Sequence, residues 1–278
     1  MDPTRGEDED RTLGTRLSFL ARLVTSGLRS FPAFLLIGGM KCGTTSLYQY
    51  LARHPGVERG SKEEVHYFDL NYHRSLLWYR AHFPYRGRGG EGPIAGDDTP
   101  YYLFHPLVPE RVARDLPDVR LVVLLRDPVA RAYSHYSHEH RRGREQLPFE
   151  QALAREEGRL EGEEERMREN ALHVSWEHMR YSYMSRGRYA EQLARWFHHI
   201  PRERFLVMQS EEMFRDPAPV VDRTLEFLNL PPMGPIEYEV HNPGSYEPMS
   251  EAAREMLEEH FQPLNEELFS LLGERFDW

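Results

Sequence analysis

Three short apolar runs predict the buried strands of a parallel sheet. They span residues 34–37, 121–125 and 205–208, and each is too short to be a helix of ordinary length. Residues 44–51 and a segment opened by Pro128 have helical patterns and follow the first two runs, and residues 189–199 precede the third. Strands that alternate with helices predict an α/β fold, a single doubly wound domain with a central parallel sheet and helices on both faces. Ligands of such sheets bind beyond the carboxyl ends of the strands.

The N-terminal region has a different pattern. Residues 1–11 are polar and predict a disordered tail. A helix is expected next, and it either lies on a membrane surface or packs against its own domain, which is the commoner arrangement. Residues 1–30 are therefore a tail and an amphipathic helix, and residues 31–278 form the main domain. The apolar positions of this helix, which have arginines between them, are Leu13, Leu17, Leu20, Val24 and Leu28.

Two later segments complete the pattern. Residues 156–169 are mostly glutamate and arginine and predict a solvated helix or a mobile excursion. Residues 251–278 predict a long helix, a break near Pro263, a second helix and an aromatic end packed on the body.

Composition limits the classes of function. The chain has 278 residues, and its 45 acidic and 35 basic residues leave a formal net charge of −10. This charge predicts repulsion of nucleic acid and of anionic membranes. The longest apolar run, residues 31–40, is shorter than the roughly 20 residues that cross a bilayer. The acidic start does not resemble a secretory signal. We expect a cytoplasmic protein without a transmembrane segment.

The turn after residues 34–37 has the composition of an anion-binding loop. Glycines let the backbone approach a ligand, while free N–H groups at a helix start, hydroxyls and a lysine attract a phosphate. The order differs from a Walker A loop, in which Gly-Lys-Ser/Thr is contiguous. The one cysteine of the chain lies at this helix start, where a depressed thiol pKa is expected. The candidate residues are Lys41, Cys42, Gly43, Thr44, Thr45 and Ser46.

A second anion site is predicted after residues 121–125. Arg126 follows this strand directly, and Ser134 lies eight residues further on, within the next helix. A guanidinium and a hydroxyl there can hold a phosphate; the alternative is a surface ion pair between Arg126 and Asp127. Two anion sites on neighbouring strand ends indicate a ligand with phosphates at both ends of a nucleoside.

These motifs resemble those of the sulfotransferases that use 3′-phosphoadenosine 5′-phosphosulfate (PAPS). Residues 34–47 resemble their 5′-phosphosulfate loop, and residues 121–134 resemble their 3′-phosphate motif. The segment Glu64-Val65-His66-Tyr67-Phe68-Asp69 is close to the Glu-Val-His-Phe-Phe-Asp segment of heparan sulfate and related carbohydrate sulfotransferases, and residues 273–278 resemble their ending. The resemblance covers residues 34–278 and implies a sulfotransferase domain with a P-loop-like PAPS-binding turn.

The resemblance also implies roles for single residues. Lys41 would meet the leaving oxygen, and Glu64 would act as the base, with His66 as the fallback. Arg126 and Ser134 would hold the 3′-phosphate, and the glycine-rich turn would hold the 5′-phosphosulfate. Sulfuryl transfer needs no metal, so none is assigned. The segment that replaces the disulfide-bearing loop of the family adds three candidate nucleotide contacts, Gly244, Ser245 and Tyr246.

One departure from the family pattern bears on the acceptor. Heparan-type enzymes usually carry a lysine where this chain has Asp98. Together with the net charge, this aspartate argues against a polyanionic acceptor. The expectation is a bacterial enzyme that sulfates a neutral hydroxyl of a sugar, a lipid or a natural product. The acceptor pocket is expected to form from residues 66–85 and 147–188 and to include aromatic side chains, namely Trp176, Tyr181, Tyr183 and Trp196.

Two other functions compete with this one. An ATP-dependent P-loop kinase would use the same fold, but the contiguous Gly-Lys-Ser/Thr is missing. A non-catalytic module that binds PAPS or another nucleotide is the third possibility, and retention of Lys41 and Glu64 speaks against it.

Overall fold

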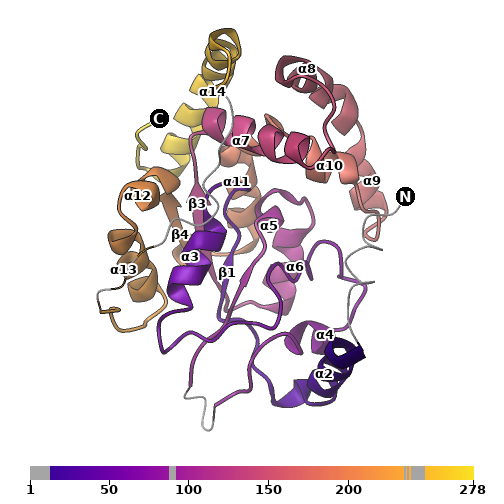
Figure 1. Ribbon diagram of the computed structural model, residues 1–278, viewed down its shortest axis with the longest axis vertical. Coiled ribbons are helices and arrows are strands. Elements are labelled where there is room, and N and C mark those ends of the chain that lie inside the picture. The colour runs from indigo at the N-terminus through magenta and orange to yellow at the C-terminus, as the bar shows by residue number, and fades with distance from the viewer. Residues whose placement is uncertain (1–12, 88–91, 235, 237, 239–247) are drawn as a thin grey trace.

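A parallel four-stranded sheet forms the centre of the molecule, shown in Figure 1 as a computed structural model that describes residues 13–87, 92–234, 236, 238 and 248–278. The strand order is β2-β1-β3-β4, and neighbouring strands are parallel. The three predicted strands are confirmed with small shifts of their ends. The strands are β1 (Phe34–Leu36), β2 (Gly96–Asp98), β3 (Arg120–Leu125) and β4 (Phe205–Gln209).

Helices cover both faces of the sheet, as predicted for a doubly wound domain (Figure 1). One face packs against α3 (Thr44–Leu51), α12 (Ser210–Arg215) and α13 (Pro217–Phe227). The other packs against α5 (Tyr101–Phe104), α6 (Val108–Asp115) and α11 (Tyr189–His199). The remaining helical segments are α2 (Leu13–Val24), η1 (Ser26–Leu28), α4 (Leu76–Arg80), α7 (Pro128–Arg141), α8 (Phe149–Leu160), α9 (Glu163–Glu169), α10 (Trp176–Arg180), η3 (Ser185–Gly187), η4 (Arg202–Arg204) and α14 (Glu251–Leu272).

Alternating side chains of the central strands enter two separate cores. Val123 of β3 packs into the core on the α11 side, whereas Val122 and Leu124 pack into the core on the α3 side. All three are fully buried. Because both faces are covered, these strands have continuous apolar runs instead of an alternating pattern. Strand β2 was not predicted, since its sequence Gly-Asp-Asp contains no apolar residue.

The C-terminal region differs from the prediction at one point. The break near Pro263 is wrong, because α14 continues through this residue. Proline removes one helical hydrogen bond, but Leu257 and Phe261 before it and Leu268 after it are buried and hold the helix on the domain. The predicted packing of the aromatic end is confirmed: Trp278 Nε1 donates a hydrogen bond of 3.0 Å to Glu211.

The segment rich in glutamate and arginine is helical, which confirms the helix of the two predicted alternatives. It forms the end of α8 and all of α9. Glu156 is buried and accepts hydrogen bonds of 2.7 Å from the backbone N–H groups of Met184 and Ser185. The prediction of solvation is therefore wrong for Glu156, whose hydrogen bonds fix the backbone at the start of η3.

The prediction that the apolar positions of the N-terminal helix pack against the domain is wrong. The helix forms as α2, but Leu17, Leu20 and Val24 are exposed, and Leu28 in η1 is exposed as well. Phe19 makes the contact with the domain instead, with its ring centroid 4.7 Å from that of His82. None of the helices within the described ranges is long and apolar enough to cross a membrane.

Two glycine substitutions test the packing of the sheet. A Cβ on Gly38 would lie 2.5 Å from the backbone nitrogen of Leu124, so Gly38→Ala should lower the free energy of unfolding by about 1–3 kcal/mol. The matched control is Gly158→Ala in α8, where a Cβ would meet nothing within 4 Å; it should raise that free energy by about 0.5–1 kcal/mol. Urea unfolding measures both, and equal effects would contradict this packing.

Candidate active site

The glycine-rich turn joins β1 to α3 in a conformation that exposes helix N–H groups. Gly43 is the N-cap of α3 with φ +85°, and a Cβ there would lie 2.4 Å from Met213 Cε. Only glycine fits this position without displacing its neighbour. The first N–H groups of a helix have no acceptor within the helix, so the turn offers the amides of Thr44, Thr45 and Ser46 to an anion.

The second predicted anion site touches the first. Arg126 at the end of β3 donates a hydrogen bond of 3.3 Å from Nη1 to the carbonyl oxygen of Lys41. The alternative, a surface pair between Arg126 and Asp127, is not what the structure shows. Both carboxylate oxygens of Asp127 cap α7 by accepting the N–H groups of Val129 and Ala130, at 3.1 and 3.2 Å. Arg126 and Ser134 therefore face the same cleft as Lys41.

The expectation for Cys42 is wrong. Its side chain is fully buried, and burial raises the pKa of the thiol to about 11. The backbone N–H of Cys42 donates to Gly39, and its carbonyl accepts from Ser210 Oγ at 2.7 Å. The helix start does not activate this thiol, because desolvation outweighs the nearby positive charges.

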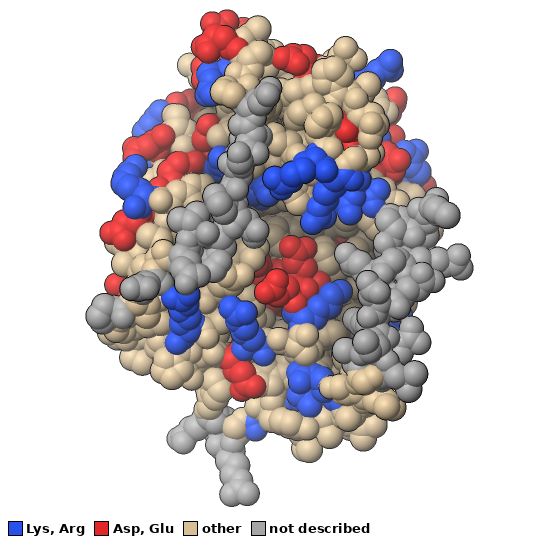
Figure 2. All heavy atoms as spheres, viewed as in Figure 1, with Lys and Arg blue, Asp and Glu red and all other residues tan. Residues whose placement is uncertain are grey.

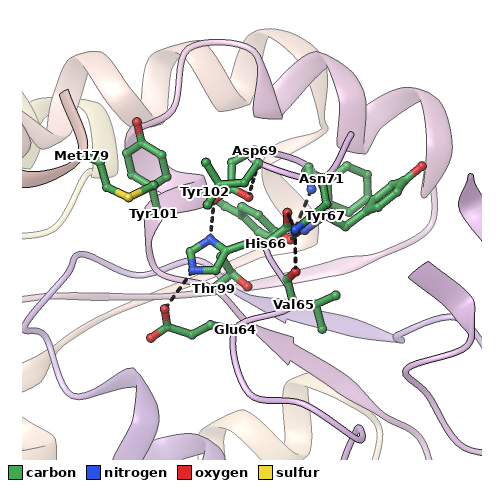
Figure 3. A network of polar contacts seen from close by, with 12 residues as sticks. Glu64, Val65, His66, Tyr67, Asp69, Asn71, Thr99, Tyr101, Tyr102 and Met179 are labelled. Carbon is green, nitrogen blue, oxygen red and sulfur yellow. Dashed lines mark hydrogen bonds and ion pairs between the residues drawn. The ribbon is translucent and has the colours of Figure 1, made fainter. Parts of the chain in front are cut away.

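A histidine lies between two carboxylates at the centre of the site (Figure 3). His66 Nδ1 is 2.7 Å from Asp69 Oδ2, and its Nε2 is 3.1 Å from Glu64 Oε2. Burial alone would lower the pKa of His66, but the attraction of both carboxylates outweighs burial and raises this pKa to about 10. The ring is therefore an imidazolium that donates to both partners. Exposure decreases along the chain of contacts, from 49% for the side chain of Glu64 to 20% for His66 and 0% for Asp69.

Backbone strain marks the same residues. The non-glycine residues with left-handed φ in the described chain are Lys41, Glu64, His66 and Asn229, at +71°, +47°, +54° and +58°. Such conformations are unfavourable for residues with a Cβ and gather at functional sites. Three of these four are candidate catalytic residues, a feature for which the sequence contains no signal.

The site opens into a cleft of ≈ 2510 Å³. Both segments predicted for the acceptor pocket line it, through Trp78 of α4 and through Trp176 and Arg180 of α10. Of the aromatic candidates, Trp176 lines the cleft, whereas Tyr183 and Trp196 are fully buried in the cores. Two further parts of the wall were not predicted from the sequence: the inner side of α2 and the exposed ring of Phe214 on α12.

The cleft is basic although the chain is acidic. Figure 2 shows acidic side chains at the centre of a hollow, with basic side chains above and below them. Three glutamates line the cleft, Glu63, Glu64 and Glu139. The basic residues that line it are Arg22, Lys41, Lys62, Arg74, Arg126, Arg141, Arg142, Arg144, Arg180, Arg186 and Arg215. The net charge of −10 therefore does not describe the surface that a ligand meets.

The inference drawn from Asp98 needs correction. This residue ends β2 and is buried, with Oδ1 lacking a hydrogen-bond partner among the described residues. Burial and the nearby Glu64 raise the pKa of its carboxyl well above the ordinary value. Asp98 thus has surroundings that favour its neutral form, and it does not line the cleft. Neither premise for a neutral acceptor, the charge of Asp98 or the net charge, holds in the structure.

The three predicted nucleotide contacts after α13 and the question of a metal site remain. Gly244, Ser245 and Tyr246 lie outside the described residues. Within the ranges described above, no group of three or more His, Cys, Asp and Glu side chains is arranged to hold a metal ion.

Comparison with known proteins identifies the class. Residues 31–261 match the sulfotransferase domain family, and the chain belongs to this family. It is thus a transferase enzyme, and the family implies PAPS as the sulfuryl donor. The crystal structure of a sulfotransferase from Alicyclobacillus acidocaldarius has a TM-score of 0.72 and 30% sequence identity, and the match covers 89% of this chain and 98% of that one.

Two of the similar proteins are heparan sulfate sulfotransferases. The heparan sulfate glucosamine 3-O-sulfotransferase 6 of Mus musculus is 29% identical over an alignment of 300 positions, gaps included, that covers 99% of this chain and 82% of the relative. The heparan sulfate glucosamine 3-O-sulfotransferase 3A1 of Mus musculus is 34% identical over 211 residues, which are 76% of this chain. The match covers 49% of that relative, about half of its length. The chain is thus a sulfotransferase that is similar in sequence to heparan sulfate 3-O-sulfotransferases.

The raised pKa of His66 predicts a pH dependence of stability. The imidazolium stabilises the fold fully below about pH 6.5, the ordinary histidine pKa, and this contribution is lost as the pH rises through about 10. His66→Asn removes the titrating group, so the free energy of unfolding should fall less over this range in the variant than in the wild type. Chemical unfolding at several pH values measures the difference; parallel profiles would show that His66 is not charged in the fold.

Proposed function

We propose that this enzyme transfers the sulfuryl group of PAPS to a hydroxyl of an anionic carbohydrate, with Glu64 as the base. The observation that carries the proposal is the contact between the two anion-binding turns at the cleft in which Glu64 is exposed. Ligands with one phosphate need only one such turn. A nucleotide with a 5′-phosphosulfate and a 3′-phosphate would use both.

The residues present fit this donor. The amides and hydroxyls at the start of α3 would hold the phosphosulfate, and Arg126 with Ser134 would hold the 3′-phosphate. Phe214 offers a surface for the adenine: its ring is half exposed, lies beside Gly43 and is 5.5 Å from the guanidinium carbon of Arg126. Stacking on an aromatic ring is a common way to hold a nucleobase.

The arrangement of charges supports Glu64 as the base. His66 is an imidazolium and has no free lone pair on the ring with which to take a proton, so it orients Glu64 instead. Glu64 Oε2 accepts from His66, which leaves Oε1 to take the proton of an acceptor hydroxyl. When bound, PAPS supplies a sulfuryl group on a good leaving oxygen. Lys41 carries the positive charge that would stabilise this oxygen as the bond to sulfur breaks.

The walls of the cleft support an anionic sugar as the acceptor. Arg74 of the α4 region lies 5.8 Å from the ring of Trp78, and Arg180 lies 4.5 Å from the ring of Trp176. An indole ring offers a flat apolar surface, and the arginine beside it attracts carboxylate or sulfate groups. The relatives named above are heparan sulfate sulfotransferases, which agrees with a charged sugar chain.

A kinase is less compatible with the site. Magnesium would need a carboxylate near the nucleotide phosphates. Asp127, the aspartate that follows the strand beside the loop, uses both oxygens to cap α7.

Replacement of the base tests the mechanism. Glu64→Gln should lower kcat about a hundredfold or more and leave the affinity for 3′-phosphoadenosine 5′-phosphate unchanged, because the variant keeps the shape but cannot take a proton. The matched control is Glu63→Gln, which removes a negative charge from the adjacent residue. Glu63 makes no hydrogen bond to His66, so this variant should lower kcat severalfold at most. Equal kcat values for Glu64→Gln and wild type would exclude Glu64 as the base. A wild type that binds the nucleotide but shows no turnover, slow PAPS hydrolysis included, would favour the non-catalytic module.

The basic walls predict a preference for charged acceptors. Arg180→Ala should raise KM for an N-sulfated heparosan oligosaccharide about tenfold and leave KM for a neutral disaccharide nearly unchanged. Arg188→Ala, an exposed arginine outside the cleft, is the control and should change neither value. Equal losses with both acceptors would contradict an anionic acceptor.

A further inference from the structure

The segment that carries the proposed base has a strained backbone. Glu64 and His66 have φ angles of +47° and +54°, and residues with a Cβ keep such angles only where their surroundings enforce them. If those surroundings were removed, the backbone would relax and the contact between Glu64 and His66 would loosen. The groups that bind the backbone of residues 64–69 therefore decide how well the base is oriented.

The hydroxyl of Tyr102 is one of these groups (Figure 3). It accepts the backbone N–H groups of Tyr67 and Phe68, at 2.8 and 3.3 Å. It donates its own proton to Asp97 Oδ2 at 3.1 Å. A phenol hydroxyl has one donor and two acceptor positions, so these three contacts use all of them. The direction of the bond to Asp97 is fixed as well, because the two N–H groups can only donate.

Asp97 connects this hydroxyl to the sheet. It lies in β2 in register with Leu35 of β1 and is 2% exposed. Its carboxyl oxygens accept two further hydroxyls, those of Thr99 and Tyr79, each at 2.8 Å. The backbone N–H of Thr99 continues the pairing by donating to the carbonyl of Leu36. The glycine-rich turn follows β1 directly, so the donor loop and the segment of the base are attached to the same pair of strands.

Asn71 holds the carbonyl groups of the same segment. Its Nδ2 donates to the carbonyls of Val65 and His66, at 3.3 and 2.9 Å, and its backbone N–H donates to the carbonyl of His66 at 2.9 Å. Both side-chain partners can only accept, which agrees with an amide nitrogen in this position. The strained segment is therefore bound through its N–H groups on one side and through its carbonyls on the other.

We propose that Tyr102 and Asn71 are positioning residues for the base. The inference rests on the proposed role of Glu64 and adds the groups that keep this carboxylate oriented toward the acceptor. Tyr102 is fully buried and does not line the cleft, so any effect of its hydroxyl on the reaction must pass through the segment that it binds. A base that is already oriented loses less conformational freedom on the way to the transition state.

A pair of tyrosine variants tests the proposal. Tyr102→Phe removes the hydroxyl that binds the segment and should lower kcat about tenfold, while the affinity for 3′-phosphoadenosine 5′-phosphate and KM for the acceptor stay within about twofold of the wild type. Expressing kcat per nucleotide-binding site removes the effect of a partly unfolded preparation.

The matched control is Tyr79→Phe, which removes another fully buried hydroxyl from the same oxygen of Asp97. In the described structure the Tyr79 hydroxyl makes no hydrogen bond to residues 64–69, and phenylalanine keeps the ring that stacks on Tyr67. This control should leave kcat within about twofold of the wild type. Equal losses of kcat in the two variants would overturn the proposal, because they would show a general effect of the core.

Repeating Tyr102→Phe in the Glu64→Gln background shows whether its effect passes through the base. A group that acts through Glu64 has no further effect once Glu64 cannot take a proton, so kcat should change less than about twofold in this background. A full tenfold loss there would overturn the proposal. Failure of the proposed function is a different result, in which Glu64→Gln alone keeps the kcat of the wild type.

A second readout needs no turnover. The raised pKa of His66 depends on its contacts with Asp69 and Glu64, so a loosened segment should lower this pKa. NMR titration of the His66 ring, assigned with His66→Asn, should show a lower pKa in Tyr102→Phe and an unchanged pKa in Tyr79→Phe.

Asn71→Ala keeps the proposal testable if Tyr102→Phe does not fold. Asn71 is only partly buried, and its loss frees the carbonyls of Val65 and His66 from their side-chain donor. Both kcat and the pKa of His66 should fall in this variant. A wild-type kcat together with a wild-type pKa of His66 would show that the segment keeps its conformation without these contacts, which would overturn the proposal.

Discussion

The parallel pairing of β1 with β3 is the constraint on which the site depends. Register places Leu36 beside Val122, and β3 continues to Leu125 alongside the glycine-rich turn, so the turns that follow the two strands lie at one edge of the sheet. Gly39 continues the pairing with a hydrogen bond to Leu124, and Arg126 bonds to the carbonyl of Lys41. Two segments about 85 residues apart in sequence thus form one cleft for an extended anion.

His66 connects this scaffold to the chemistry. Asp69 is buried and ionised, and it can stay so because the imidazolium of His66 lies against it. The same imidazolium holds Glu64 at the cleft in a strained backbone conformation. Buried groups therefore fix the orientation of the exposed carboxylate of Glu64. A glutamate that is already oriented loses less conformational entropy on reaching the transition state than a flexible one would.

Much of the fold and of the donor site was predictable from the sequence. The strands at 34–37 and 121–125 are visible as apolar runs, and the glycine-rich turn has a local composition that reflects its role. Properties that depend on tertiary burial were not predictable: the thiol of Cys42, the buried carboxyl of Asp98 and the uncovered side of α2 all differ from the expectation. In each case the local sequence pattern was interpreted correctly, but contacts with residues distant in the sequence determined the pKa or the exposure.

Thermal unfolding with a set of nucleotides tests the central claim, that two touching anion sites hold one nucleotide. The comparison uses 3′-phosphoadenosine 5′-phosphate, ADP and ATP with magnesium, on the wild type and on Arg126→Ala. At a concentration 100 times its Kd, the bisphosphate should stabilise the wild type by about 2.7 kcal/mol. ADP should stabilise it less, and the variant should lose the difference between the two. A larger shift with ATP and magnesium, or an equal shift with ADP, would contradict the account.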